Sequence, residues 1–448
     1  MKTGTSLFHR PALQLPWWTI ASEEHPLALA ARIASHFDIP LPMEAYEFPE
    51  KGNINQHTFV ILAGPREQPR ELLLQKINQR VFTRPRNVMA AMIACIQAQQ
   101  RSIADGRVPE GQEWETIQLL PTRQGNLFLD LQDRRESSCW RLMIKIPECT
   151  TYKSLSEISD PARRLFLAEE AGKGLALYGD FTSAMDTGGL ENPLPGYRNT
   201  RNYYSQLKSV LAGSRTPEEA ADFLPADPIL RQSTELHFRL HISEKEFQRR
   251  SQDPQLLPFI RLSLEQEKFG LTLLEAMESG RIRTVAIHGD TKLDNFLFSR
   301  RTGQVKALVD LDTIMPHTWL ADWGDMVRSL SNVAGEKEAD LERIQVDMDI
   351  YRALARGFLS TAREVTAEEI SLMADAVEII ALELGIRFLS DYLRGDSYFK
   401  LGPADPPELN RIRAMVQLTL FQRLRAKRDQ ILPCLREARE SRLNSRTS

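Results

Sequence analysis

The chain has 448 residues, of which 42% are hydrophobic and 26% are charged, and its formal net charge is -3. These values are typical of a folded globular protein that is long enough for two or more domains. Acidic and basic residues are interleaved, so no basic face for nucleic acid is expected. No apolar run approaches the ~18 residues of a membrane span, and the N-terminal segment lacks the features of a secretory signal.

The four cysteines show no spacing typical of a metal or redox site. They are Cys95, Cys139, Cys149 and Cys434. This usage predicts reduced thiols in a cytoplasmic protein.

The first third of the chain is rich in predicted strands. A helix is expected over residues 22–37, where Leu, Ala, Ile and Phe recur at helical spacing, and another over 85–100, beginning at Pro85. Short runs of β-branched, aromatic and apolar residues predict strands. These runs are 45–48, 58–62, 72–77, 115–120, 127–131 and 140–146.

After about residue 152 the pattern changes to helical spacing. The expected helices are 158–181, 197–212, 216–223, 254–279, 337–361, 367–394 and 407–438. A strand-rich part followed by a helical part predicts an α+β fold with two lobes. We expect an N-terminal lobe at 1–147, a C-terminal lobe at 148–438 and a polar tail at 439–448, with the crossing at Pro147–Tyr152.

The most informative stretch runs from Ile287 to Asp312 and reads IHGDTKLDNFLFSRRTGQVKALVDLD. It contains the pattern H-x-D-x-K-x-x-N, followed by an Asp at the end of an apolar run. Asp290 can accept the proton of a substrate hydroxyl, and Lys292 can contact a phosphoryl group during its transfer. With His288 included, the pattern is far more specific than a lone His-Gly-Asp.

Oxygen-bearing side chains of the same stretch are candidate metal ligands. They are Asn295, Asp310 and Asp312. Carboxylate and amide oxygens suit Mg²⁺, which uses one or two carboxylates together with phosphate oxygens. The alternative is an Asp/Asn-rich β-hairpin, which would need neither the His nor the Lys. The stretch therefore predicts a site for phosphoryl transfer with Mg²⁺.

A glycine turn and a strand lysine form the candidate nucleotide site. The segment Gly52, Asn53, Ile54 and Asn55 lies between two expected strands, where small polar residues let backbone N–H groups approach an anion. Lys76 stands in the apolar strand LLLQKIN. Alone, the turn is typical of a hairpin and the lysine of a solvent-facing strand position. Beside the catalytic loop, they match how kinase-type folds bind phosphates.

Together these motifs resemble those of a known family. The glycine turn, LQKIN, HGDTKLDN, VDLDT and DWGDMVR are similar to the motifs of the aminoglycoside phosphotransferase and choline kinase superfamily. The later stretches GIRFLSDYLRGDSYFK and LNRIRAMVQL add a resemblance to bacterial N-acetylhexosamine 1-kinase type enzymes. The resemblance extends from about residue 24 to 430 and implies a bilobal protein-kinase-like fold.

The resemblance also implies roles for individual residues. Asp290 would be the catalytic base, and His288 and Asp322 would steady its loop. Asn295 and Asp310 would bind Mg²⁺. Residues 52–55 and Lys76 would contact the ATP phosphates. One departure is clear: such kinases pair the strand lysine with a helix Glu, and residues 85–100 contain no acid.

The acceptor is expected beside Asp290 in the helical lobe. The candidate acceptor residues are Arg387, Asp391, Tyr398 and Arg328. Arg387 and Asp391 are four residues apart, so an intrahelical ion pair is the alternative interpretation.

Three functions remain open. The first is a kinase for a small metabolite, with a sugar or N-acetylhexosamine as the acceptor. The second is a choline- or aminoglycoside-type kinase, and the third is a catalytically silent binding protein of the same fold. No nucleic-acid or membrane partner is expected, and the oligomeric state is left open.

Overall fold

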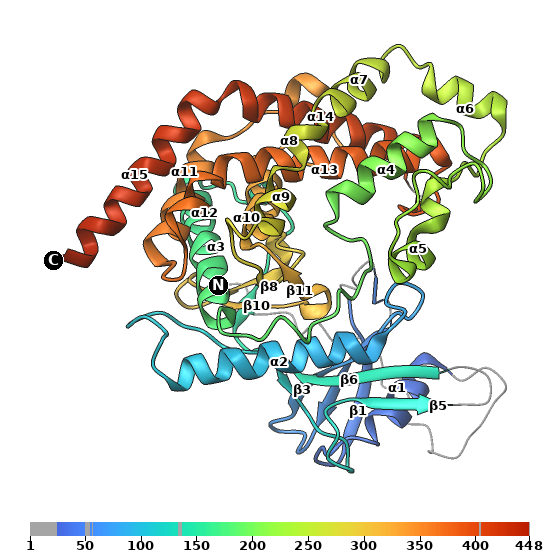
Figure 1. The fold of residues 1–448 in the computed structure, drawn as a ribbon. Coiled ribbons are helices and arrows are strands. Elements are labelled where there is room, and N and C mark those ends of the chain that lie inside the picture. Colours follow the sequence, from blue (N-terminus) through green and yellow to red (C-terminus); the bar gives the residue numbers. More distant parts are fainter. Residues whose placement is uncertain (1–24, 50–53, 56, 133–136, 403–404, 448) are drawn as a thin grey trace. The chain divides into compact units, whose positions relative to one another are not determined.

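The computed structural model describes residues 25–49, 54–55, 57–132, 137–402 and 405–447 (Figure 1). The chain divides into two compact units. The first comprises residues 1–90 and 115–147, and the second comprises 91–114 and 148–448. Helix α2 (Pro85–Ala104) begins in the first unit and continues in the second.

The first unit is built on an antiparallel sheet. Within its described residues the sheet has six strands in the order β1-β2-β3-β6-β4, with β5 also paired to β6. The strands are β1 (Met43–Glu47), β2 (Thr58–Ala63), β3 (Arg70–Lys76), β4 (Gln118–Leu119), β5 (Leu129–Gln132) and β6 (Ser137–Ile144). Helix α1 (Pro26–Ala34) covers one face of this sheet.

The core of the first unit contains alternate residues of its strands and one face of helix α1. In β3, Leu72 and Leu74 are fully buried while Leu73 between them is partly exposed, because successive strand side chains point to opposite faces. They pack with Ile33 of α1 and with Trp140 and Leu142 of β6 in one apolar cluster. Alternation thus sets the sheet face that the helix covers.

The second unit is mostly helical. Its long helices are α3 (Pro161–Thr182), α4 (Thr200–Leu211), α10 (Trp319–Ser331), α11 (Met348–Thr361), α13 (Met373–Arg394), α14 (Leu409–Ala426) and α15 (Arg428–Thr447). Shorter ones are α5 (Pro228–Thr234), α6 (Glu244–Ser251), α7 (Leu257–Glu265), α8 (Glu267–Gly270), α9 (Thr272–Glu278) and α12 (Ala367–Ser371). Figure 1 shows α13 and α14 side by side, as their packing contacts require.

Small β-structures carry the loops of the second unit. Strand β8 (Val285–Ile287) pairs antiparallel with β11 (Met315–His317), placing Ile287 opposite Met315. Strand β9 (Phe296–Ser299) lies between β10 (Val305–Leu308) and β7 (Cys149–Thr150). Beneath the first pair, Ile287 and Met315 pack with Ala321 and Ile380, so helices α10 and α13 support the loop that follows β8.

The α+β prediction is confirmed, and several element boundaries differ from those expected. Residues 216–223 form a turn, because the segment is short and ends before Pro225. The region 254–279 is divided among α7, α8 and α9, and the segment before Met348 is irregular apart from a short 3₁₀ turn. The strand expected at 115–120 is reduced to Gln118–Leu119, and α15 runs on to Thr447.

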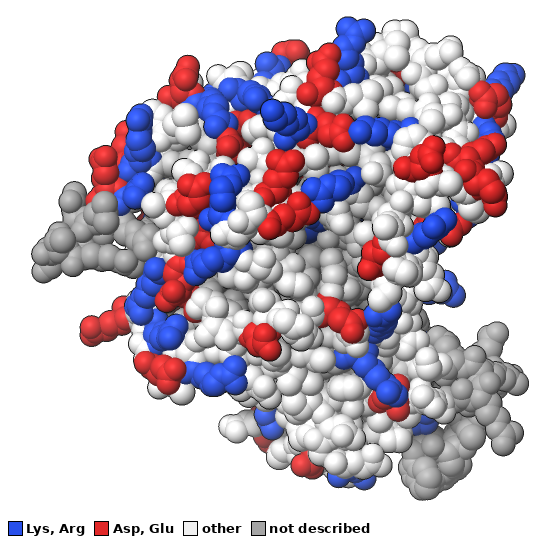
Figure 2. Space-filling model, viewed as in Figure 1, with Lys and Arg blue, Asp and Glu red and all other residues white. Residues whose placement is uncertain are grey.

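The face of the molecule shown in Figure 2 has no large patch of one charge. On the face seen in Figure 2, acidic and basic side chains alternate over the helices. Across the part of the chain that the structure describes, no helix combines the length and apolarity needed to cross a membrane. All four cysteines are free thiols, and only Cys149 is partly exposed.

Candidate active site

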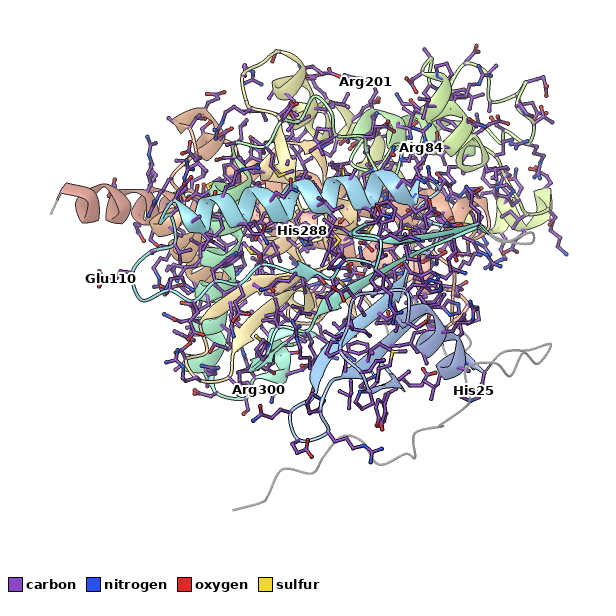
Figure 3. The ribbon with its side chains drawn as sticks, turned by 90° about the horizontal axis from the view of Figure 1, so that it is seen from below. His25, Arg84, Glu110, Arg201, His288 and Arg300 are labelled. Carbon is purple, nitrogen blue, oxygen red and sulfur yellow. The ribbon has the colours of Figure 1, made fainter. Side chains whose placement is uncertain are left out.

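The residues of the HGDTKLDN motif lie on the loop between β8 and β9. It begins at His288 and ends in the 3₁₀ turn η3 (Leu293–Asn295). In Figure 3, His288 lies among other side chains, whereas Glu110 and Arg300 lie at the rim of the second unit. The loop therefore starts from a buried anchor.

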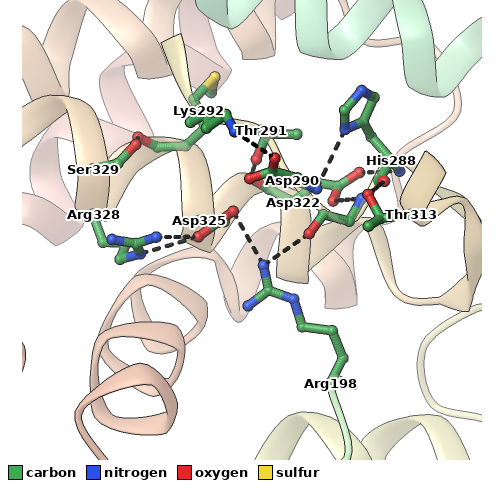
Figure 4. Close-up of polar contacts among 12 residues, drawn as sticks. Arg198, His288, Asp290, Thr291, Lys292, Thr313, Asp322, Asp325, Arg328 and Ser329 are labelled. Atoms are coloured by element: carbon green, nitrogen blue, oxygen red, sulfur yellow. Dashed lines mark hydrogen bonds and ion pairs between the residues drawn. The ribbon is translucent and has the colours of Figure 1, made fainter. Parts of the chain in front are cut away.

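Asp322 of helix α10 holds the start of the loop (Figure 4). One carboxylate oxygen accepts the backbone N–H of His288 at 2.7 Å, and the other accepts that of Gly289 at 2.8 Å. The Thr291 hydroxyl donates to the Asp322 carbonyl at 2.7 Å. Burial raises the pKa of Asp322, while His288 and the two N–H groups act in the opposite direction. A buried carboxylate is thus satisfied by the loop that it orients.

His288 has a defined tautomer. Its Nδ1 accepts the Asp290 N–H at 3.3 Å, so Nε2 is the nitrogen that donates, to the Val309 carbonyl at 2.8 Å. The Thr313 hydroxyl donates to the His288 carbonyl at 2.7 Å. The ring is fully buried. His288 therefore connects the loop to the segment that carries Asp310, Asp312 and Thr313.

Gly289 cannot be replaced without strain. Its φ is +84°, and a Cβ at this position would lie 2.6 Å from the Thr313 carbonyl oxygen and 2.9 Å from Cε of Met315. Only glycine combines this backbone conformation with such a close approach.

Asp290, Lys292 and Asn295 meet at the centre of the loop. Lys292 Nζ lies 3.0 Å from Oδ2 of Asp290, and these side chains are 42% and 33% exposed. The Asn295 amide nitrogen donates to the Asp290 carbonyl at 2.7 Å and to its carboxylate at 3.2 Å. Burial lowers the pKa of Lys292, but Asp290, Asp294 and Asp310 outweigh it, so the pKa is raised. Lys292 is therefore a permanent cation beside a reachable carboxylate.

The candidate metal ligands lie around this centre. Asn295 uses its amide nitrogen on Asp290, which leaves its amide oxygen for a cation. Asp310 follows β10 in a left-handed conformation with φ of 66° and is exposed, whereas Asp312 is buried. The described residues contain no cluster of three or more His, Cys, Asp or Glu side chains arranged for a metal. An amide and one or two carboxylates fit Mg²⁺, which completes its shell with water and phosphate oxygens.

The nucleotide candidates belong to the first unit, and part of them can be placed. Gly52 and Asn53 lie outside the described residues. The Asn55 side chain accepts the Asn78 N–H at 3.0 Å, and the Asn78 amide donates to the Ile54 carbonyl at 2.9 Å. These bonds tie residues 54–55 to the end of β3.

Lys76 lies at the end of β3, opposite Trp140 of β6. Helix α2, which follows, contains no acidic residue over its whole length. No residue of α2 can therefore supply the glutamate that pairs with the strand lysine in kinases of this type.

Arg387 is surrounded by aromatic rings. Its guanidinium carbon lies 5.0, 5.1, 5.8 and 5.2 Å from four ring centroids, those of Tyr197, Tyr203, Tyr398 and Phe399. We call these four rings the aromatic cage. Among the described residues, no carboxylate lies within ion-pair distance of Arg387. Its nearest helical neighbour, Glu383, binds Arg198 and Thr200 instead.

Two of the candidate acceptor residues have partners within the second unit. The alternative interpretation, an intrahelical Arg387–Asp391 ion pair, is wrong: Asp391 binds Arg394 at 2.8 Å and accepts the N–H groups of residues 397–399, because the chain folds back after α13. Arg328 is buried, and its hydrogen bonds go to Asp325 and Glu336. Both side chains are thus held by protein partners, and their contact with an acceptor stays a prediction.

The sequence analysis missed Tyr197 and Arg198, which come from the segment before α4. The Tyr197 hydroxyl donates to the Gly289 carbonyl at 2.8 Å, and Arg198 donates to the same oxygen at 3.3 Å. Arg198 also binds Asp325 at 3.1 Å (Figure 4). Burial raises the pKa of Asp325, but Arg328 and Arg198 outweigh it and hold the pKa at about 2. No local pattern in PLPGYRNT marks these contacts.

Comparisons with known proteins show a matching family model over part of the chain and a similar fold. Residues 152–356 match the phosphotransferase enzyme family. A microcompartment-associated aminopropanol kinase is similar in structure, with a TM-score of 0.51 and 12% identity over 90% of this chain and 98% of that chain. This likeness confirms the kinase-like fold, with an N-terminal antiparallel sheet and a helical C-terminal region.

Two further solved structures match less closely. An amicoumacin kinase has 11% identity over 87% of this chain and 92% of its own, with a TM-score of 0.46. A choline kinase of Streptococcus pneumoniae has 10% identity over 88% of this chain and 97% of its own, with a TM-score of 0.38.

Proposed function

We propose that this chain, whose residues 152–356 match the phosphotransferase enzyme family, is an ATP- and Mg²⁺-dependent kinase whose acceptor is a sugar or N-acetylhexosamine. The proposal depends above all on one observation. Asp290 is half-exposed in a loop whose first residues are held through their backbone by Asp322, Tyr197 and Arg198, and Lys292 lies 3.0 Å from its carboxylate. A positioned base beside a cation is what transfer to a hydroxyl requires.

In this mechanism Asp290 orients the acceptor hydroxyl and accepts its proton as the hydroxyl oxygen attacks the γ-phosphate. Lys292 exchanges its contact with Asp290 for the phosphoryl oxygens, on which charge develops. Asn295 and Asp310 would hold Mg²⁺, with Asp312 as a further candidate. When bound, that ion would neutralise charge on the phosphates. Lys76 and residues 52–55 would contact the nucleotide.

The aromatic cage supports a neutral, hydroxyl-bearing acceptor. Tyr197 contributes one ring to the cage and also contacts Gly289, the residue before Asp290, so the cage lies beside the proposed base. Exposed Tyr398 and half-buried Arg387 supply an aromatic face and guanidinium donors. Sugars are bound by such combinations of a flat apolar face and planar hydrogen-bonding groups.

A choline- or aminoglycoside-type acceptor is the second candidate. Kinases of amino alcohols are among the proteins of similar fold. A cationic acceptor would be repelled by Arg387, which has no carboxylate neighbour within ion-pair distance in the described part of the chain. The arrangement therefore favours the sugar over the amine.

A silent binding protein is the third candidate. It is favoured by the lack of an acid in α2 and disfavoured by the contacts of the Asp290 carboxylate with both Lys292 and Asn295.

The test is an ADP-release screen against hexoses, N-acetylhexosamines and amino alcohols. We expect turnover with a sugar, and we expect Asp290→Asn to lower the single-turnover rate by ~10²–10⁴-fold, the usual worth of a general base. Asp349→Asn is the matched control, because that carboxylate is 73% exposed on α11. ATP affinity should be unchanged in both variants. Stabilisation by ATP without turnover on any acceptor would instead support the silent protein.

A further inference from the structure

The peptide unit between Gly289 and Asp290 is held at both of its polar atoms. Its N–H, which belongs to Asp290, donates to Nδ1 of His288 at 3.3 Å. Its carbonyl oxygen, which belongs to Gly289, accepts from Tyr197 at 2.8 Å and from Arg198 at 3.3 Å. The plane of this peptide sets the direction in which the Asp290 side chain leaves the backbone.

The two donors to the Gly289 carbonyl are themselves fixed. Arg198 adopts a left-handed conformation with φ of 61°. Its N–H donates to the Tyr203 hydroxyl at 2.9 Å, and its carbonyl accepts from Nε2 of His317 at 3.1 Å. Its guanidinium binds Asp325 at 3.1 Å and Glu383 at 3.4 Å. Because these contacts fix Arg198 in a strained conformation, it can hold the Gly289 carbonyl in one position.

Tyr197 also belongs to the aromatic cage. Its ring centroid lies 5.0 Å from the guanidinium carbon of Arg387 and 4.9 Å from that of Arg198. Burial raises the pKa of Tyr197 to about 12, so its hydroxyl keeps its proton and remains a donor at neutral pH. One side chain therefore contacts the acceptor cage through its ring and the catalytic loop through its hydroxyl.

We propose that Tyr197 and Arg198 are positioning residues, which set the orientation of the Asp290 carboxylate and couple it to the acceptor cage. The proposal rests on the proposed function, since it assigns the cage to the acceptor. An acceptor that packs against Arg387 and Tyr197 stabilises the Tyr197 ring. The hydroxyl of that ring in turn holds the Gly289–Asp290 peptide in the productive orientation. Misplacement of a catalytic group by about 1 Å can cost ~10²-fold in rate. A small tilt of the Gly289–Asp290 peptide is therefore enough to lower the rate of transfer.

The test separates the hydroxyl of Tyr197 from its ring. Tyr197→Phe keeps the ring beside Arg387 and removes the donor to Gly289. We expect kcat to fall about tenfold or more, with KM for ATP and for the acceptor within about twofold of wild type and with an unchanged thermal midpoint. Tyr204→Phe is the matched control, because that buried hydroxyl has no hydrogen-bond partner.

A second readout does not depend on turnover. Hydrogen exchange of peptides covering residues 288–295 should be faster in Tyr197→Phe and unchanged in Tyr204→Phe. A kcat within twofold of wild type would overturn the proposal. Equal losses in both variants, or a fall in the thermal midpoint together with higher KM values, would also overturn it.

The two proposals can fail separately. If the wild-type protein turns over no acceptor, the proposed kinase fails, and hydrogen exchange alone decides the positioning role. Faster exchange at 288–295 in Tyr197→Phe then supports that role, and unchanged exchange refutes it.

Discussion

At the scale of single residues, Asp180 near the end of α3 makes stability depend on pH. Its carboxylate is buried and accepts the backbone N–H groups of Arg363 and Glu364 at 2.9–3.1 Å. Burial raises its pKa to about 6, although the two N–H groups act in the opposite direction. In the unfolded chain the same group has a pKa near 3.9.

We predict that the stability of Asp180→Asn relative to wild type increases between about pH 4 and 6. In this window the folded state holds the Asp180 proton more tightly than the unfolded state, so wild-type stability falls as the pH rises. A shift of about two units corresponds to ~3 kcal/mol at most. Asparagine stays neutral and can still accept the N–H groups. Thermal midpoints of both proteins at pH 4.5 and 7.5 provide the measurement, and a difference that does not change with pH would contradict the prediction.

At the scale of elements, α3 and α11 approach each other through glycines. A Cβ on Gly172 would overlap the Leu354 carbonyl and lie 2.9 Å from the Phe358 nitrogen. A Cβ on Gly357 would overlap the Glu169 carbonyl. The clash is with backbone in both cases, so the helices would have to separate. Since α3 also contacts β8 and β10, this close approach supports the strands from which the catalytic loop hangs.

We predict opposite effects for two Gly→Ala changes in these helices. Gly357→Ala should destabilise the protein by ~1–3 kcal/mol, the usual cost of overpacking. Gly179→Ala on α3 should stabilise it by ~0.5–1 kcal/mol, because a Cβ there meets nothing within 4 Å and alanine is the better helix former. Urea unfolding of the two variants measures both effects. Stabilisation by Gly357→Ala would show that the helices do not pack this closely.

At the scale of the whole molecule, the proposed nucleotide and metal residues are divided between the two units. Lys76 belongs to the first unit, and Asn295 and Asp310 belong to the second. A ligand that binds only the folded protein stabilises it in proportion to the logarithm of its concentration over Kd. Thermal stability therefore reports nucleotide and metal binding without any knowledge of the acceptor.

We predict that ATP with Mg²⁺ raises the thermal midpoint, and that removal of the metal with EDTA abolishes most of the increase. At ATP a hundredfold above Kd, the stabilisation should be ~2.7 kcal/mol. In Asp310→Ala the Mg²⁺-dependent part should disappear, whereas Asp349→Ala should retain it. If Asp310→Ala keeps the wild-type response to Mg²⁺, Asp310 is not a metal ligand, and Asp312 becomes the candidate.

The sequence alone determined the helices, the strands and the loop motif, which are encoded by residues close together in the chain. The apolar run at 72–77 predicted β3, and helical spacing predicted α2, α4 and α13 within a few residues. The loop from His288 to Asn295 was identified because four residues with distinct chemical roles lie at close spacing. Such patterns depend on local geometry, which repeats with a fixed period along the chain.

Only the tertiary structure decided which distant residues meet. Tyr197 and Arg198 contact the Gly289 carbonyl across about ninety residues of sequence, and nothing near either segment indicates it. Asp391 lies one turn from Arg387, yet it caps residues 397–399, because the chain turns back after Arg394. The partners of a buried carboxylate are the groups that the fold places next to it. They include backbone N–H groups, which need an acceptor when they are buried. The positions of these partners depend on where the chain returns, which helix and sheet packing sets.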